Sequence, residues 1–215
     1  MIEDLPESLL GTKEHWDHVY AQELSNFHEC GDEGEVCKVD SSKPLLEFGS
    51  GNGHLLVALA KAGYTRLMGV DYSDSAVTLG AEYAASSGFR HIKFETADLL
   101  NKDSINLDPA FLILDKGTFD AISLGPEPDM DAPKTAPGAR ISLLASRYKD
   151  ALHQCLSTEP SSMFIITSCN WTRDELVQLF KPDFTAIDEI MHPTFSFGGQ
   201  TGQTVTTIVF NRKAI

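Results

Sequence analysis

The sequence has little positive charge. Its 215 residues include 17 Lys and Arg against 31 Asp and Glu, a formal net charge of −14 at pH 7. A surface that follows nucleic-acid phosphates needs a basic stripe, and none is present. We therefore expect no nucleic-acid partner, whereas an acidic protein attracts basic proteins over a distance.

Long apolar runs are also missing. No stretch is long enough to cross a bilayer, and the acidic N-terminus lacks the basic and apolar regions of a secretory signal. We therefore expect no membrane partner and a location in the cytoplasm, with the nucleus left open as a second one. With 42% hydrophobic residues the chain can bury the core of one α/β domain.

Cysteine is scarce. The four cysteines are Cys30, Cys37, Cys155 and Cys169, and no two of them form a C-x-x-C pair. Scattered cysteines of this kind are typical of reduced thiols in a cytosolic protein. His28 precedes Cys30 and Cys37, but this spacing matches no common zinc pattern and lacks a fourth ligand. The sequence therefore predicts no metal site.

The most informative stretch that is present lies at residues 45–54. An apolar run leads into Glu47 and then into the alternate glycines Gly49, Gly51 and Gly53, ahead of a helical pattern at 55–62. This order predicts a strand, a tight turn and a helix N-terminus, where glycine lets a ligand approach the backbone. The dinucleotide fingerprint is G-x-G-x-x-G, and here the third glycine comes one residue too early for it.

Acid-x-Gly-x-Gly-x-Gly is instead the pattern of S-adenosylmethionine-dependent methyltransferases. This pattern assigns four residues to cofactor binding, namely Glu47, Gly49, Gly51 and Gly53. A nicotinamide oxidoreductase is disfavoured by the glycine spacing.

Two further acids follow predicted strands. Asp71 ends the strand predicted at 65–71 and lies 20 residues after Gly51. A carboxylate in this place can accept the ribose hydroxyls of the cofactor. Tyr72, which follows it, is expected to contact the cofactor as well. Asp98 follows the next strand; in the methyltransferase pattern it accepts from the adenine amino group, and Leu99 offers its backbone. Each acid alone also fits a helix N-cap or an exposed loop. Together with Glu47 they favour a cofactor site.

Apolar periodicity predicts strands that alternate with helices. The predicted strands are 45–49, 65–71, 92–97, 111–115, 163–168, 184–190 and 204–211; the predicted helices are 12–27, 53–62, 74–86, 140–156 and 172–180. Four prolines predict an irregular loop at 125–138. The fold class is therefore α/β, a Rossmann-like seven-stranded methyltransferase sheet with helices on both faces and a terminal antiparallel hairpin.

Three blocks of sequence resemble one methyltransferase family in particular. They are Leu10 to Tyr20, Asp115 to Leu124, and the pair of late motifs at 166–172 and 193–199. The resemblance is to the methyltransferases that modify lysines of translation elongation factor 1-alpha, and it covers nearly the whole chain. It implies S-adenosyl-L-methionine as cofactor and elongation factor 1-alpha, a basic GTPase, as protein substrate. We expect a monomer.

The resemblance also implies functional residues near the methyl group. Asp115 follows the fourth strand and is the expected catalytic residue and a further cofactor contact, with a loop N-cap as the alternative. The expected substrate-binding residues are Trp16, Tyr20, Phe119, Asn170, Trp171, Phe195 and Phe197. Aromatic rings suit a cation that gains methyl groups. The alternative is that these rings belong to the core.

The chain departs from the family between Val36 and Pro44. Where the family continues into a further helix, this chain enters its first strand after a short linker. We predict an N-terminal helix and shortened linker over residues 1–43 and a methyltransferase domain over 44–215, which form one structural unit. Without that helix we expect apolar surface near the first strand. Two other functions stay open: a catalytically impaired S-adenosylmethionine-binding module, and a methyltransferase of small molecules or N-terminal amines.

Overall fold

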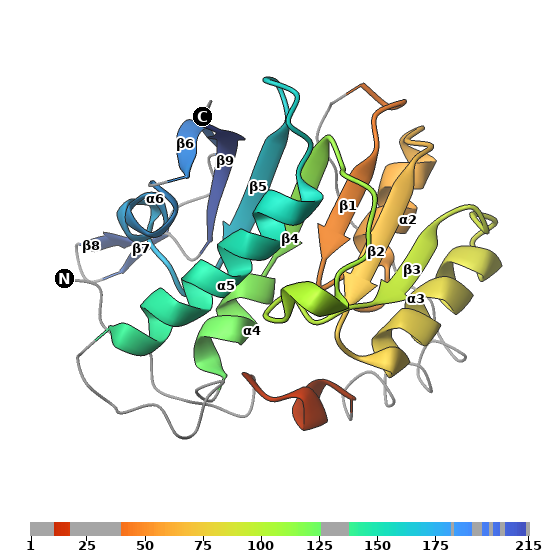
Figure 1. Cartoon of the computed structure of the whole chain (residues 1–215), viewed down its shortest axis with the longest axis horizontal. Helices are drawn as coiled ribbons and strands as arrows, with labels where there is room; N and C mark the ends of the chain where they lie inside the picture. The colour runs from red at the N-terminus through yellow and green to blue at the C-terminus, as the bar shows by residue number, and fades with distance from the viewer. Residues whose placement is uncertain are drawn as a thin grey trace.

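The computed structural model describes residues 11–17, 40–125, 138–181, 183–190, 195–197, 200–202 and 205–213. Its main feature is a seven-stranded sheet with the strand order β3-β2-β1-β4-β5-β9-β6 (Figure 1). These strands are β1 (Leu45–Phe48), β2 (Leu67–Asp71), β3 (Lys93–Thr96), β4 (Leu112–Lys116), β5 (Met163–Ser168), β6 (Phe184–Ile190) and β9 (Thr206–Arg212).

Helices connect most of these strands. They are α2 (His54–Lys61), α3 (Asp74–Ser86), α4 (Thr118–Leu124), α5 (Ala139–Cys155), α6 (Arg173–Phe180) and the 3-10 helix η2 (Lys102–Ser104). A second sheet has two strands, β7 (Phe195–Phe197) and β8 (Gln200–Gly202). A short helical segment at 13–17 precedes all of them.

Alternate residues along the strands face two different cores. One core joins α4, α5 and α6 to the strand side chains Leu46, Phe48, Ile113, Phe164, Ile166, Ile208 and Phe210. The other joins α2 and α3 to the neighbouring strand positions Leu45, Leu112, Ile165 and Val209. Figure 1 accordingly shows α4 and α5 in front of the sheet and α2 behind it. The prediction of helices on both faces is confirmed.

The order of the strands positions the site. β1 pairs in parallel with both β2 and β4, so the sheet grows outward from β1 in two directions. Ligands of open α/β sheets bind beyond the carboxyl ends of the strands at such a switch point. At the far edge β9 pairs antiparallel with both β5 and β6. The predicted seven-stranded sheet with a terminal antiparallel hairpin is confirmed.

Helix α4, the 3-10 helix η2 and the strand pair β7–β8 were not predicted. Helix α4 has seven residues, too few for a helical period to stand out, and the β7–β8 pair lies within the connection between β6 and β9. Of the helix predicted at 12–27, residues 13–17 are helical and residues 18–27 lie outside the described part. Residues 126–137 of the predicted irregular loop also lie outside it.

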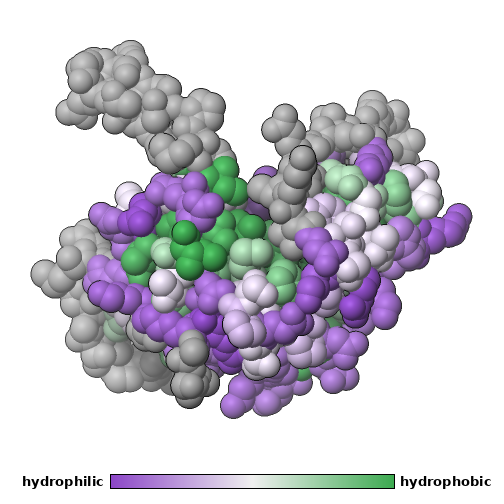
Figure 2. Space-filling model, turned by 90° about the horizontal axis from the view of Figure 1, so that it is seen from above, coloured by the Kyte–Doolittle hydropathy of each residue, from purple (hydrophilic) through white to green (hydrophobic). Residues whose placement is uncertain are grey.

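One face of the molecule gathers apolar residues. Figure 2 shows this area from above, between hydrophilic residues. Among the described large hydrophobic side chains, Ile187 is the exposed one, at 53%. The apolar surface expected near the first strand stays a prediction, because residues 18–39 lie outside the description. No helix in the described ranges is long and apolar enough to cross a membrane.

Candidate active site

The glycine-rich turn between β1 and α2 has the backbone that its sequence requires. Gly49, Gly51 and Gly53 all have positive φ, at 63°, 50° and 73°, a region that side chains disfavour. A Cβ atom at Gly49 would also lie 2.0 Å from Thr118 Oγ1. Only glycine fits there, because the Thr118 hydroxyl donates to the Phe48 carbonyl at 2.7 Å and so stands against the turn.

Asp71 ties this turn to the next helix. Its Oδ2 accepts from the Gly51 N–H and its Oδ1 from the Ser73 N–H, both at 3.0 Å. Burial raises the pKa of the carboxyl, and the backbone donors oppose that effect. Each carboxylate oxygen can accept a further hydrogen bond. Asp71 therefore has the capacity to receive hydroxyl groups from a ligand.

A cavity of about 320 Å³ opens beside Asp71, within the usual range for small-molecule sites. It is lined by Gly11, Trp16, Gly49, Asp71, Tyr72, Ala97, Asp98, Leu99, Leu100, Lys116, Gly117, Thr118, Ala121, Ile122 and Gly125. Six predicted site residues are in this wall: Trp16, Gly49, Asp71, Tyr72, Asp98 and Leu99. Residues at the carboxyl ends of β1, β2, β3 and β4 thus meet around one cavity, and of the three predicted acids Asp71 and Asp98 line it whereas Glu47 does not.

Sequence reasoning missed the wall that comes from β4 and α4. Lys116, Thr118 and Ile122 line the cavity because Gly117, with a φ of 82°, turns the chain from the strand into the helix. In the sequence block from Asp115 to Leu124, Gly117 follows an apolar strand, and this glycine was the signal that could have predicted the helix.

Glu47, by contrast, is buried and does not line the cavity. Its side chain is 5% exposed, and its Oε2 has no hydrogen-bond partner among the described residues. Burial raises the pKa of Glu47 well above its ordinary value, while the charge of Lys116 lowers it. A buried carboxylate oxygen without a partner is costly, so this atom suits a cationic ligand group.

Asp115 caps α4. Its Oδ1 accepts from the Thr118 N–H at 2.8 Å, and its Oδ2 accepts from the Phe119 N–H at 3.0 Å and the Tyr148 hydroxyl at 2.6 Å. The side chain is 2% exposed and does not line the cavity. Asp115 thus satisfies backbone donors in the first turn of α4, although the N-cap residue itself is Gly117. Direct action of Asp115 on the substrate or cofactor stays a prediction.

The structure corrects the expected placement of two aromatic rings. Phe119 is fully buried and Trp171 is 4% exposed, and both belong to the core that α5 and α6 cover. Trp171 Nε1 donates to Ser123 Oγ at 3.2 Å, so its polar group is satisfied inside the protein. Neither ring reaches the cavity, because α4 turns Phe119 toward the sheet.

The other predicted substrate residues are spread out. Asn170 is exposed at the end of β5, away from the cavity lining. Phe195 and Phe197 lie in β7, and their side chains are outside the description, as is Tyr20. Trp16 is the predicted substrate residue that does line the cavity.

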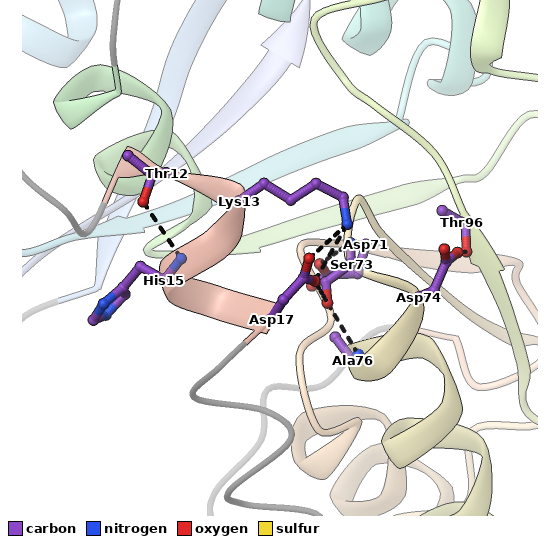
Figure 3. Close-up of polar contacts among 9 residues, drawn as sticks. All are labelled: Thr12, Lys13, His15, Asp17, Asp71, Ser73, Asp74, Ala76 and Thr96. Atoms are coloured by element: carbon purple, nitrogen blue, oxygen red, sulfur yellow. Dashed lines mark hydrogen bonds and ion pairs between the residues drawn. The ribbon is translucent and has the colours of Figure 1, made fainter.

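The N-terminal segment reaches the cavity through specific contacts (Figure 3). Thr12 Oγ1 accepts from the His15 N–H at the start of the helical segment. Asp17 accepts from Lys13 and from the hydroxyl of Ser73, the N-cap of α3. These hydrogen bonds lower the pKa of Asp17, that from Ser73 most. The segment is therefore held beside Asp71.

At its other end the segment packs against α4. A Cβ atom at Gly11 would lie 2.0 Å from the backbone nitrogen of Gly125, so the two glycines allow the backbones to touch. Arg140 donates to the Gly125 carbonyl and holds this point from α5.

Comparison with known proteins agrees with this geometry. A family model described as a methyltransferase domain matches residues 39–211. EEF1A lysine methyltransferase 2 of Homo sapiens is 38% identical, with 95% of this chain and 87% of the relative covered. Its Danio rerio counterpart is 37% identical, with 98% and 91% covered. Protein-lysine N-methyltransferase efm4 of Schizosaccharomyces pombe is 38% identical, with 96% and 95% covered.

Solved structures support the fold. A TehB-like SAM-dependent methyltransferase from Corynebacterium glutamicum has a TM-score of 0.58 at 14% identity, with 92% of this chain and 98% of that chain covered. A ribosomal protein L11 methylase from Lactobacillus delbrueckii has a TM-score of 0.53 at 14% identity, with 94% and 79% covered. The chain has the methyltransferase domain, and by its near full-length similarity it belongs to the family of protein-lysine methyltransferases that includes EEF1A lysine methyltransferase 2 and efm4.

Proposed function

We propose that this protein uses S-adenosyl-L-methionine to methylate a lysine of translation elongation factor 1-alpha. The observation that carries the proposal is the meeting of Asp71 and Asp98 on one cavity wall beside the glycine turn. The names of the relatives supply the protein substrate. We further propose that it acts as a monomer in the cytoplasm, where its substrate works.

The donor set of the cavity fits this cofactor. Asp71 can accept the ribose hydroxyls, and Asp98 with the Leu99 backbone can hold the adenine. When bound, S-adenosylmethionine supplies an electrophilic methyl group on a sulfonium. The chain's own residues then have to present a neutral amine to it and keep out water.

A lysine is a nucleophile only when it is neutral. From a pKa near 10.4, deprotonation at pH 7 costs about 4–5 kcal/mol. A poorly solvated site lowers that pKa, and fixed orientation offsets several kcal/mol more. The cavity has an apolar wall that would keep water away from the amine, formed by Trp16, Ala121 and Ile122. The net charge of −14 would speed the encounter with a basic substrate protein.

The test is a transfer assay with methyl-labelled S-adenosylmethionine and purified elongation factor 1-alpha. We expect label on the elongation factor and methyl-lysine in its peptides by mass spectrometry. Asp71→Ala is the matched inactive control. Cofactor binding without transfer would instead support the impaired binding module. Label that enters small molecules or N-terminal amines would support the other alternative.

A further inference from the structure

Asp120 is a buried acid of α4 that the proposed function does not yet use. Its side chain is 8% exposed and does not line the cavity, whereas the next two residues of the helix, Ala121 and Ile122, do. A carboxylate is costly to bury unless its oxygens accept hydrogen bonds. The donors that Asp120 finds therefore show which part of the protein it serves.

Those donors come from the turn that follows β5. Asp120 Oδ1 accepts from the Ser168 hydroxyl at 2.5 Å, and its Oδ2 accepts from the Cys169 N–H at 2.8 Å. The Asn170 N–H is a further donor, and together these bonds oppose the rise in the pKa of Asp120 that burial causes. One carboxylate of α4 thus holds three successive residues that are distant from it in sequence.

Two more buried side chains complete this connection. Ser168 Oγ accepts from the Trp171 N–H at 2.9 Å and from the Asn170 N–H at 3.1 Å. Trp171 Nε1 donates to Ser123 Oγ, whose hydroxyl donates to the Asp120 carbonyl at 2.8 Å. We call the buried residues Asp120, Ser123, Ser168 and Trp171 the α4–β5 clamp.

The turn that the clamp holds is itself exposed. Cys169 and Asn170 both lie at the surface, although their N–H groups point inward to the clamp. The side-chain amide of Asn170 forms no hydrogen bond with any residue that the structure describes. An amide offers a donor and an acceptor, which is the pair that a peptide backbone offers in return. A fixed turn with an outward amide, next to the helix that walls the cavity, therefore suits a peptide segment.

We propose that Asp120 is a positioning residue, which fixes the turn at Cys169 and Asn170 as a docking site for the peptide segment that carries the target lysine. This inference rests on the proposed function, because it takes a protein as the methyl acceptor. The side chains of Asp71 and Asp98 hydrogen-bond elsewhere, to the glycine turn, to the start of α3 and to the loop after β3. Loss of the clamp should therefore change the use of the protein substrate and spare cofactor binding.

The test is steady-state methyl transfer at varied elongation factor 1-alpha, beside calorimetry with S-adenosylhomocysteine. Asp120→Ala should raise the KM for the elongation factor about tenfold and leave kcat and the cofactor-product affinity within about twofold, since it removes binding that ground state and transition state share. Asn170→Ala should raise the same KM about threefold at the parent's unfolding stability, because it removes only the exposed amide. Asp150→Ala, at an exposed acid of α5 outside the clamp, is the control.

Two further variants test the coupling. The double variant of Asp120→Ala and Asn170→Ala should have the KM of Asp120→Ala alone, because an amide on a released turn has no fixed place to lose. Asp120→Asn keeps an acceptor oxygen for the turn and should recover part of the lost substrate binding. It also replaces Asp120→Ala in the assay if the alanine variant does not fold.

The outcomes separate this inference from the function on which it rests. A parent KM in the folded Asp120 variants would overturn it. A loss of kcat at the parent KM would overturn it too, since the clamp would then serve only the cavity wall of α4. Equal weakening of S-adenosylhomocysteine binding would assign Asp120 to the stability of the whole domain. A parent protein that transfers no methyl group to the elongation factor would instead refute the proposed substrate.

Discussion

Replacing Asp115 with asparagine would remove its charge at nearly constant shape. In the parent, the two carboxylate oxygens accept from three donors: the Thr118 and Phe119 N–H groups and the Tyr148 hydroxyl. An asparagine has one acceptor oxygen, so its amide NH₂ must meet one of the backbone donors. A buried donor without a partner costs about 1–3 kcal/mol, and the variant should be less stable by that amount at a pH where Asp115 is ionised.

The difference should depend on pH. Burial raises the pKa of Asp115 to about 7, from 3.8, against the effect of its donors. The folded parent therefore keeps a proton that the unfolded chain loses. The stability that this proton supplies is complete below the unfolded pKa and is lost as pH rises through about 7. At roughly 1.4 kcal/mol per pH unit, the parent loses at most about 4 kcal/mol of folding stability between the ordinary pKa of 3.8 and the folded pKa of about 7.

The assay is urea unfolding of the parent and of Asp115→Asn, monitored by circular dichroism and repeated at pH values from about 5.5 to about 8. Because asparagine does not titrate, the stability advantage of the parent should shrink across this range. Asp103→Asn, at an exposed acid of η2, is the control. A difference that stays constant with pH would refute a protonated, buried Asp115.

The same variant tests the predicted catalytic role. Methyl transfer to elongation factor 1-alpha should fall well over tenfold while the protein stays folded, because α4 supplies part of the cavity wall. Transfer at the parent rate would exclude Asp115 from both catalysis and positioning.

Three other substitutions test separate parts of the site. Asp71→Ala should weaken S-adenosylmethionine binding in calorimetry, since ribose hydroxyls lose a charged acceptor worth roughly 1.5–3 kcal/mol per bond; a change below about threefold would contradict the ribose assignment. Asp17→Ala should speed tryptic cleavage after Lys13, because the contact with the Ser73 hydroxyl is lost, and an unchanged rate would mean that other contacts hold the segment. Trp171→Ala should lower the free energy of unfolding by about 3–5 kcal/mol, and a variant of parent stability that fails only with the protein substrate would restore its predicted role in substrate binding.

The sequence by itself determined the sheet and one side of the site. Alternate glycines and acids at strand ends are local signals, since each depends on the backbone of a single turn or on one strand's end. Glu47, Asp71 and Asp98 could therefore be placed at one edge of the sheet before their partners were known. Periodicity likewise predicted the strands and the longer helices, because each buries one face.

Only the tertiary structure decided which way the side chains near β4 turn. Asp115 and Lys116 are neighbours in sequence and leave β4 on opposite faces, yet Asp115 is buried against the start of α4 while Lys116 lines the cavity. Phe119 and Trp171 lie within matched motifs but pack in the core, since a short helix and distant strands enclose them. The contact of Gly11 with Gly125 joins residues far apart in the chain. Such choices depend on packing between elements, which no local pattern in the sequence records.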